Sequence, residues 1–345
     1  MKNIHGGDVY HHPGVLDYSA NINPLGTPKA VIEAMTKGMD KLVHYPDIYC
    51  EKLREKLGVF HNISVKHIVC GNGAADLIFR LVFALKPKKA LVLSPCFAEY
   101  EQALKVVGTQ VDHYNLNKEN FLLTEQFVDA LTEDMDMVIL CNPNNPTGQL
   151  IAPELLYKIL ECCERKNIFL LLDECFLDFM KEESKYSLLT RAETCKKVFV
   201  LRAFTKMYAV PGIRLGYGVC GDEKILEAIY EAGPPWNVSV LAQIAGEVAL
   251  DEKDYVKRTI TLIEQEKQYL YDVFDDLQIH YFKSAANYIL FQGSLNWKEE
   301  LLKKGILIRD CSNYLNLEKG YYRIAVKSHE ENITFVKALR EVVEQ

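Results

Sequence analysis

Five short runs of largely apolar residues, each followed by a polar residue or a glycine, constrain the fold of this chain most strongly. They cover residues 67–70, 90–93, 137–140, 168–172 and 197–201. Within each run the apolar residues are consecutive rather than alternating, as in strands that are buried on both faces. The stretches between the runs, such as residues 153–166, have the spacing of amphipathic helices. The sequence therefore predicts an α/β fold in which helices cover a largely parallel sheet.

Polar residues and glycines that suit ligand binding come shortly after these runs. They are Gly71-Asn72-Gly73 after the first run, residues 142–148 after the third, Asp173 after the fourth and Lys206 after the fifth. Ligands of parallel sheets bind beyond the carboxyl ends of the strands. We therefore expect the functional site at this edge of a large domain that spans about residues 30–235.

Two other segments flank the expected large domain. After Gly233-Pro234-Pro235-Trp236, a long helical pattern runs to about residue 275. Strand-like runs at 286–291, 306–309 and 321–326 and a closing helical pattern at 330–343 follow it. Residues 236–345 are therefore predicted to form a smaller α+β domain. Residues 1–29 are rich in glycine, proline and asparagine, which predicts an arm rather than a packed element, lying on the small-domain side as a lid over the site.

The charge and the cysteine pattern exclude several classes of protein. With 40 Lys and Arg against 47 Asp and Glu, the formal net charge is -7, whereas nucleic-acid and anionic-membrane surfaces need clustered basic residues. No run of 18 apolar residues is present to span a membrane, and the N-terminus lacks the apolar core of a signal peptide. The ten cysteines form no Cys-x-x-Cys pair, so we expect no metal site and free thiols in a reducing cytoplasm.

Lys206 and Asp173 each have an ordinary and a functional interpretation. An isolated lysine is usually a solvated surface residue, but Lys206 lies just beyond an expected strand and Arg214 follows eight residues later. A desolvated lysine forms a Schiff base with a carbonyl cofactor, and a neighbouring arginine holds a phosphate. Asp173 either caps a helix or, if buried, pairs with a protonated pyridine nitrogen and makes that ring an electron sink.

Two turn-rich segments also have two interpretations each. Residues 142–148 predict a rigid loop, which at the same time presents the amide of Asn145 as a partner for a cofactor's phenolic oxygen. Residues 71–76 lead from a strand into a helix but lack the third glycine of a dinucleotide fingerprint. A single phosphate group at the helix N-terminus is therefore favoured over a dinucleotide.

Taken together and in this order, these motifs resemble the fold-type-I pyridoxal-phosphate enzymes, the aspartate aminotransferase superfamily. The motifs are Asn144-Asn145-Pro146-Thr147-Gly148, then Asp173-Glu174-Cys175-Phe176, then Thr205-Lys206 with Arg214, and the resemblance covers nearly the whole chain. It implies pyridoxal 5'-phosphate as the cofactor and a large domain with a mostly parallel seven-stranded sheet between helices.

The resemblance also implies a role for individual residues, with Lys206 and Asp173 as the catalytic pair. The cofactor-binding residues would be Lys206 (covalent link), Asp173 (pyridine nitrogen), Asn145 (phenolic oxygen), Phe97 (stacking on the ring) and Gly73, Ala74, Thr205 and Arg214 (phosphate). Tyr45 matches the tyrosine that reaches into the neighbouring subunit's site, which implies a homodimer with shared active sites.

Two positions depart from the family's pattern. Many members have a serine or threonine three residues before the lysine, where the hydroxyl binds phosphate, but this chain has Ala203. Transaminases usually have a tyrosine three residues after the aspartate, but this chain has Phe176. The electronic properties of the cofactor are therefore expected to differ from those in a standard transaminase.

The N-terminal segment narrows the resemblance to one branch. His5-Gly6-Gly7-Asp8-Val9-Tyr10 and residues 16–26 resemble the threonine-phosphate decarboxylases of cobalamin synthesis, as do Phe176 and residues 308–314 and 321–325. These enzymes convert L-threonine O-3-phosphate to (R)-1-amino-2-propanol O-2-phosphate and carbon dioxide. The resemblance implies a small phosphorylated amino acid as substrate, and the residues that would bind it are His5, Asn21, Arg309 and Arg323.

Three other functions remain open from the sequence. Histidinol-phosphate aminotransferases resemble the body of the chain equally well but usually lack the His-Gly-Gly arm. A serine-phosphate decarboxylase differs by one methyl group on the substrate, which pocket contacts discriminate by only about 1–3 kcal/mol. A module that holds the cofactor without turnover is disfavoured by the intact Lys206, Asp173, Arg309 and Arg323.

The expected substrate residues have ordinary interpretations as well. His5 could belong, with His11 and His12, to a flexible or metal-scavenging terminus, and the two arginines could be surface charges. Arg309 and Arg323, however, lie in or beside strand-like apolar stretches, where an unpaired guanidinium is costly. An anionic substrate would explain them, because two arginines suit a phosphate or a carboxylate.

Overall fold

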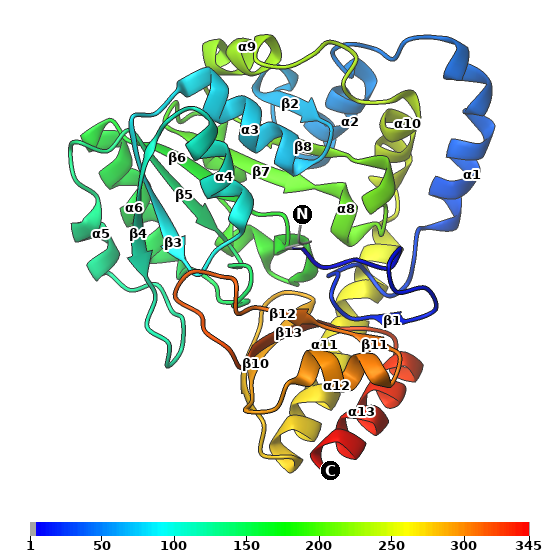
Figure 1. Cartoon of the computed structure of the whole chain (residues 1–345). Coiled ribbons are helices and arrows are strands. Elements are labelled where there is room, and N and C mark those ends of the chain that lie inside the picture. The colour runs from blue at the N-terminus through cyan, green and yellow to red at the C-terminus, as the bar shows by residue number, and fades with distance from the viewer. Residues whose placement is uncertain (1–4, 345) are drawn as a thin grey trace.

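The computed structural model describes residues 5–344, and a seven-stranded sheet organises its large domain (Figure 1). In spatial order the strands are β2 (Ile68–Gly71), β8 (Gly216–Val219), β7 (Val198–Ala203), β6 (Phe169–Asp173), β5 (Met137–Cys141), β3 (Lys89–Ser94) and β4 (Gln110–Asn115). Neighbouring strands are parallel except at β8, which is antiparallel to both β2 and β7. The expected α/β fold with a mostly parallel sheet is confirmed.

Helices cover the strands of this sheet, so that β5, β6 and β7 are buried along their whole length. The helices of this part of the chain are α1 (Lys29–Lys37), α2 (Glu51–His61), α3 (Ala74–Leu85), α4 (Ala98–Val106), α5 (Gln126–Ala130), α6 (Pro153–Lys166), α7 (Leu189–Ala192), α8 (Phe204–Met207), α9 (Glu223–Glu231) and α10 (Val240–Ala249). Short 3₁₀ helices occur at Met39–Val43, Val65–His67, Leu177–Phe179, Glu183–Tyr186 and Pro211–Ile213.

The smaller domain is built on a four-stranded antiparallel sheet. Its strands, in spatial order, are β12 (Arg309–Asp310), β13 (Tyr321–Ala325), β10 (Tyr288–Gln292) and β9 (His280–Phe282), and its helices are α11 (Lys253–Asp276), α12 (Trp297–Lys303) and α13 (His329–Val343). The long helical pattern expected between residues 236 and 275 is interrupted, because α10 ends at Ala249 and α11 begins at Lys253. Of these two helices, α10 packs against α1 and α2 of the large domain.

Residues 16–23 of the N-terminal segment are packed, so the prediction that residues 1–29 form an arm rather than a packed element is wrong for this part. Strand β1 (Leu16–Asp17) pairs in parallel with β11 (Ile306–Leu307) of the small domain, beside which it lies in Figure 1. Tyr18 is fully buried and donates a hydrogen bond to Asn332 Oδ1 over 2.9 Å. The glycine- and asparagine-rich composition hides these contacts because their partners lie some 300 residues away in the chain.

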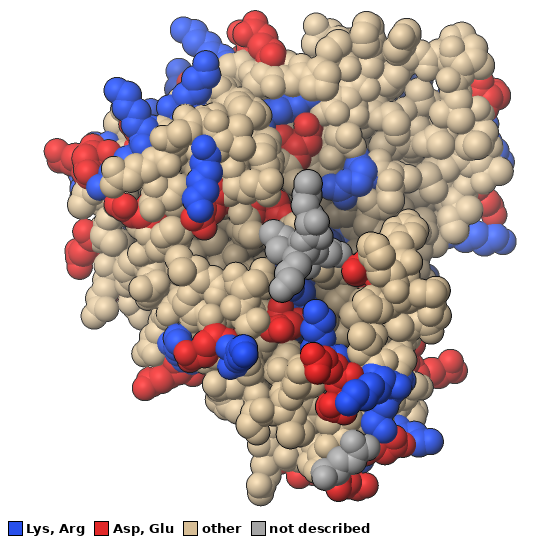
Figure 2. Space-filling view, viewed as in Figure 1, with Lys and Arg blue, Asp and Glu red and all other residues tan. Residues whose placement is uncertain are grey.

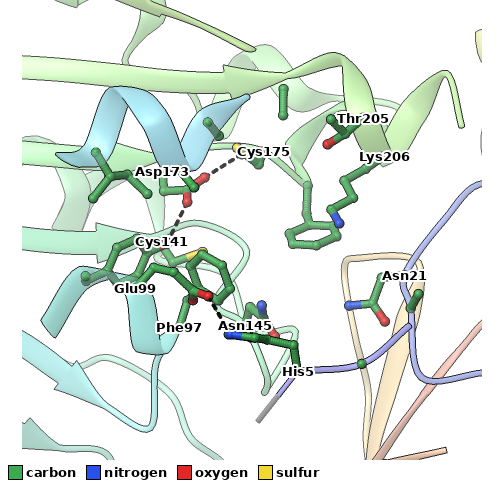
Figure 3. Close-up of a pocket in the computed structure, with 18 of the residues that line it drawn as sticks. His5, Asn21, Phe97, Glu99, Cys141, Asn145, Asp173, Cys175, Thr205 and Lys206 are labelled. Atoms are coloured by element: carbon green, nitrogen blue, oxygen red, sulfur yellow. Dashed lines mark hydrogen bonds and ion pairs between the residues drawn. The ribbon is translucent and has the colours of Figure 1, made fainter. Parts of the chain in front are cut away.

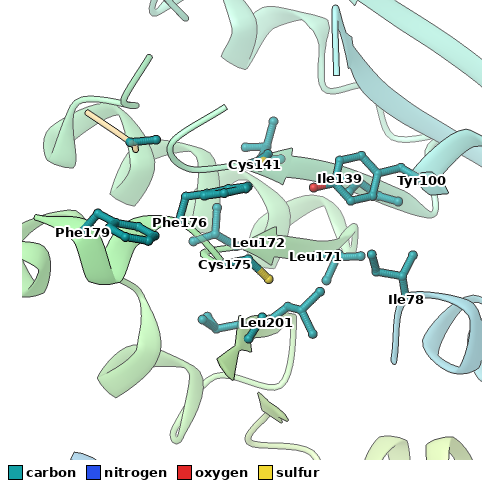
Figure 4. Packing of buried hydrophobic residues seen from close by; sticks show 14 of the residues in the cluster. Ile78, Tyr100, Ile139, Cys141, Leu171, Leu172, Cys175, Phe176, Phe179 and Leu201 are labelled. Carbon is teal, nitrogen blue, oxygen red and sulfur yellow. The ribbon is translucent and has the colours of Figure 1, made fainter. Parts of the chain in front are cut away.

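The hydrophobic core reaches the edge of the sheet where the strands end. Figure 4 shows Ile139, Leu171 and Leu201 of β5, β6 and β7 packed in one cluster with Ile78 of α3 and Tyr100 of α4. This packing makes the sheet edge a rigid platform.

All ten cysteines lie in the described part of the chain, and none forms a disulfide. In residues 5–344 no helix is both long and apolar enough to cross a membrane.

Candidate active site

A cavity of about 260 Å³ lies at the carboxyl edge of the large sheet (Figure 3). Eleven residues singled out in the sequence line it: His5, Asn21, Ala74, Phe97, Asn145, Asp173, Thr205, Lys206, Arg214, Arg309 and Arg323. Gly73 does not line the cavity but directly precedes Ala74 and contacts Arg214. Tyr45 lies outside the cavity, 78% exposed, and stacks on Trp236 with 4.6 Å between the ring centroids.

Asp173 and Lys206 are brought together by the pairing of two parallel strands. Asp173 is the last residue of β6, and Lys206 lies in α8, which begins directly after β7. The Asp173 carboxylate is buried and accepts hydrogen bonds from Tyr100 Oη over 2.6 Å and from the backbone N–H of Cys175 over 2.9 Å. These two donors fix the orientation of the buried carboxylate.

The Lys206 amine is held in an environment that favours its neutral form. Burial lowers the pKa of Lys206 from its ordinary 10.5 to about 8, and the positive charges of Arg323 and Arg214 act in the same direction. The ring of Phe176 lies 5.9 Å from Nζ. A lysine that is partly neutral near physiological pH is a nucleophile for carbonyl carbons.

A cradle of groups that suit a phosphate lies where β2 leads into α3. Gly73 has a φ of +87°, and a Cβ atom there would lie 2.5 Å from Arg214 Nη2. Helix α3 begins at Ala74, so the free N–H groups of its first turn and the guanidinium of Arg214 converge beside Thr205. Backbone N–H groups at a helix N-terminus together with an arginine bind phosphate well.

Arg323 is the more deeply buried of the two small-domain arginines that line the cavity. Its side chain is 5% exposed, and it donates to Asn145 Oδ1 and, over 3.0 Å, to the backbone oxygen of Ser19. Within residues 5–344, Arg323 Nε has no hydrogen-bond partner, and no carboxylate pairs with this guanidinium. Because an uncompensated buried charge is costly, the site is suited to an anion supplied from outside the chain.

Two further polar residues surround this anion site. Arg309 donates over 2.8 Å to both the backbone oxygen of Asp310 and Asn313 Oδ1, and it lies over the ring of Tyr314. The Asn21 side chain is buried, and its Oδ1 atom lacks a partner among the described residues. The positions of Arg309, Asn21 and Arg323 around one cavity make it complementary to a small, strongly anionic molecule.

Several cavity residues have no signal in the sequence. Tyr100 follows Phe97 by one helical turn, and this spacing is the one clue that both face the site. Ser19 contributes its backbone oxygen from a segment with no regular pattern. Glu99 is a carboxylate in a helix whose other glutamate, Glu101, forms an ordinary ion pair with Lys105. No group of three or more His, Cys, Asp or Glu side chains that suits a metal ion occurs in the described chain.

A comparison with protein families decides what kind of site this is. The family model for aminotransferase class I and II matches residues 13–339, which is most of the chain. The chain belongs to the aminotransferase class I and II family. The family is one of pyridoxal-phosphate enzymes, so the protein is an enzyme with pyridoxal 5'-phosphate as its cofactor.

Individual members of the aminotransferase class I and II family are similar to this chain over nearly its full length. Threonine-phosphate decarboxylase from Salmonella typhimurium is 36% identical, with 99% of this chain and 97% of that protein covered. Histidinol-phosphate aminotransferase from Methanothermobacter thermautotrophicus is 30% identical over 96% of this chain and 89% of that protein. The crystal structure of histidinol-phosphate aminotransferase from Clostridium acetobutylicum superposes with a TM-score of 0.90, at 31% identity and over 96% and 99% of the two chains.

The chemistry of the cavity fits the family's cofactor. The phosphate cradle at Gly73 leaves no room for a side chain, a buried carboxylate is available for the pyridine nitrogen at Asp173, and a nucleophilic amine is available at Lys206. At position 203 the chain has an alanine, so one hydroxyl that would donate to the phosphate is missing. At position 176, where transaminases usually have a tyrosine, the ring of Phe176 packs against Tyr288 in an edge-to-face arrangement. Both departures expected from the sequence are therefore present at the cavity wall.

The rate at which the cofactor-free enzyme takes up pyridoxal phosphate should depend on the protonation of Lys206. Only the neutral amine attacks the aldehyde, so with a pKa of about 8 the rate should rise about tenfold between about pH 7 and pH 9 and then level off. A lysine with an ordinary pKa would give about a hundredfold rise without levelling. Stopped-flow absorbance of the bound cofactor measures this profile. Arg323→Gln should move the plateau to higher pH, because it removes a positive charge that lowers the Lys206 pKa.

Gly73→Ala should weaken cofactor binding by at least about tenfold, because the new Cβ would displace Arg214 from the cradle. Equilibrium titration of the cofactor-free enzyme measures this dissociation constant. Gly108→Ala is the matched control, because Gly108 also has a positive φ, of +80°, but has open space around it. Both variants should also lose folding stability to backbone strain, because a positive φ is unfavourable for a residue with a Cβ atom. Equal cofactor affinities for the two variants would contradict the placement of the phosphate at Gly73.

Proposed function

We propose that the chain decarboxylates L-threonine O-3-phosphate to (R)-1-amino-2-propanol O-2-phosphate, supplying the nucleotide-loop linker for cobalamin synthesis. The observation that carries this proposal is the buried Arg323 beside Lys206, which meets only uncharged partners among the described residues. The 36% identity to threonine-phosphate decarboxylase from Salmonella typhimurium along nearly the whole chain supports it as well.

In the proposed site the cofactor is held by the residues that the family pattern assigns. These are Lys206 for the covalent link, Asp173 for the pyridine nitrogen, Asn145 for the phenolic oxygen, Phe97 for the ring face, and Gly73, Ala74, Thr205 and Arg214 for the phosphate. When bound, pyridoxal phosphate supplies an electron sink that weakens the bonds to the substrate's α-carbon. We assign the return of a proton to that carbon to the Lys206 amine, which lines the cavity and would be freed by the substrate's own amine.

The choice of reaction depends on which group of the substrate the arginines hold. The bond to the α-carbon that stands perpendicular to the cofactor ring is the one that breaks, and a transaminase keeps the carboxylate near the ring plane with an arginine. Here we propose that Arg309 and Arg323 chiefly anchor the substrate's phosphate, and that His5 and Asn21 help to set its orientation. The carboxylate is then free to stand perpendicular and leave, because charge-assisted bonds to the phosphate already fix the substrate.

The purified holoenzyme should release carbon dioxide from L-threonine O-phosphate without any 2-oxo acid. L-Threonine should turn over at least about a hundredfold more slowly, because it lacks the group that the charged side chains hold. Product analysis by mass spectrometry, with and without 2-oxoglutarate, tests both points. If turnover requires the 2-oxo acid and no carbon dioxide appears, the decarboxylase proposal is wrong.

The second candidate function is histidinol-phosphate aminotransferase. It is favoured by the TM-score of 0.90 and 31% identity to the enzyme from Clostridium acetobutylicum. Amino transfer from histidinol phosphate to 2-oxoglutarate in the same product analysis would identify it. L-Serine O-phosphate, which lacks one methyl group, belongs in the assay as a third substrate, since contacts with a methyl group change specificity by about 1–3 kcal/mol.

We further propose that the enzyme is a homodimer in which Tyr45 reaches the partner's active site. An exposed apolar surface supports this, formed by Ile32, Met39, Leu42, Val43, Tyr45, Ile48, Tyr49 and Trp236. Figure 2 shows mostly uncharged side chains over the loop that follows α1, whereas charged side chains lie along the outer edge of α1 itself. Apolar surfaces of this extent usually mark protein interfaces. The Tyr45 ring is 78% exposed and does not line the cavity of its own chain, which leaves it accessible to a second chain.

A further inference from the structure

Glu99 places a carboxylate in a cavity whose other features suit an anion. The residue lies in the first turn of α4, two residues after Phe97, and its side chain is 14% exposed. One oxygen, Oε1, lies 3.2 Å from His5 Nε2, whereas the buried Oε2 has no hydrogen-bond partner within residues 5–344. Figure 3 shows this pair across the cavity from Lys206.

A buried carboxylate is unfavourable unless a positive charge or a hydrogen-bond donor stabilises it. Burial raises the pKa of Glu99, and the positive charges of His5, Arg309 and Lys206 oppose that rise. A substrate phosphate held by Arg309 would also repel the Glu99 carboxylate directly. An ordinary surface role is excluded by the burial, and a role in holding the cofactor's phosphate is excluded because the cradle lies at Gly73. Among the described residues, the ion pair that Glu99 forms is the one with His5.

The backbone around His5 is attached firmly to the small-domain side of the cavity. A Cβ atom on Gly6 would lie 2.2 Å from the backbone oxygen of Ser19, and the Gly7 N–H donates to Ser19 Oγ over 2.7 Å. The same Ser19 oxygen accepts a hydrogen bond from Arg323. The arm is thus fixed at Ser19, next to the proposed substrate arginine, and the His5–Glu99 pair joins it to the large domain.

We propose that Glu99 is a positioning residue, which holds the His5 imidazole over the mouth of the cavity so that it meets the substrate's phosphate. This inference rests on the proposed function only in that the substrate is a phosphate monoester, which threonine phosphate and histidinol phosphate share. The His5–Glu99 pair connects the N-terminal arm, which is attached at Ser19, to helix α4 of the large domain. Its loss should therefore release the arm from the large domain without changing the cofactor's own contacts.

A double-mutant cycle on the holoenzyme tests whether Glu99 acts through His5. Steady-state kinetics with L-threonine O-phosphate should show that His5→Ala and Glu99→Ala each raise KM by about tenfold and leave kcat nearly unchanged. The double variant should be no worse than His5→Ala alone. Glu99→Gln should recover most of the affinity, because its amide oxygen still accepts a hydrogen bond from the imidazole. Losses that multiply in the double variant would overturn the proposal.

Two controls separate this role from a general effect on folding. Glu101→Ala removes a glutamate from the same helix that pairs with Lys105 and His113 rather than with His5, so its KM should match the wild type. L-Threonine should react equally slowly with all variants, because it has no phosphate for His5 to meet. If the wild type instead transfers the amino group of histidinol phosphate, the decarboxylase proposal fails, and the same cycle is measured with that ester. A kcat loss without a KM change would contradict the proposed role of Glu99 with either substrate.

Discussion

Lys206→Ala should lower turnover by at least about a thousandfold. The variant lacks the amine that links to the cofactor and the group proposed to return a proton to the substrate. Its cofactor should be removed by dialysis and should not be fixed by borohydride. Lys267→Ala is the matched control. Burial lowers the pKa of Lys267 to about 8 as well, but this lysine lies outside the cavity and donates to the backbone oxygen of Ser284. A borohydride-fixed cofactor on the Lys206 variant would contradict the assignment.

The inactive Lys206→Ala protein also provides a test of the shared active site. Mixed with Tyr45→Phe, which should bind the cofactor more weakly, it should form dimers in which one of the two sites contains both native residues. Activity of the mixture should therefore exceed the sum of the separate proteins after subunit exchange. A monomer in analytical ultracentrifugation that retains full activity would exclude the dimer, and no gain on mixing would exclude a Tyr45 that crosses the interface.

The approach of Asp173 and Lys206 is predictable from sequence because it depends on strand ends alone. Parallel strands present their carboxyl ends at one edge, so residues that follow β6 and β7 meet there whatever the helices do. The proximity of Arg214 and Gly73 cannot be predicted in the same way. It depends on the pairing of β2 with β8, and β8 contains no apolar run that would reveal it as a strand. Gly218 in β8 is a glycine because the Phe199 ring would lie 1.9 Å from a Cβ atom there.

The features that the sequence analysis did not predict have a common physical cause. Each of them depends on contacts with residues that are distant in the chain. Strand β4 is half-exposed at the edge of the sheet and contains Gln110, Asp112 and His113, so its sequence lacks a buried run. The packing of residues 16–23 depends on β11 and α13 at the other end of the chain. Glu99 has the sequence context of a solvated helical glutamate, and only the arm that covers it makes it part of the cavity.

Arg323→Gln should reduce kcat/KM for threonine phosphate more than any other change on the substrate side of the cavity. Truncating one partner of a buried charge pair costs about 2–5 kcal/mol, or between about 30-fold and 4,000-fold. Arg309→Gln should have the smaller effect, of about tenfold, because Arg309 is only partly buried and is in a more solvated position. Absorbance titration should show that both variants still bind the cofactor, since neither side chain contributes to the cradle at Gly73.

A series of three ligands identifies the substrate group that Arg323 holds. Aminopropanol phosphate has the phosphate without a carboxylate, L-threonine has the carboxylate without a phosphate, and threonine phosphate has both. We expect Arg323→Gln to weaken the binding of aminopropanol phosphate as strongly as that of threonine phosphate and to leave L-threonine unaffected. This result follows if the arginine anchors the phosphate, so that the carboxylate stands free beside the ring. The opposite pattern would assign Arg323 to the carboxylate, which is the arrangement of a transaminase, and would contradict the decarboxylase proposal.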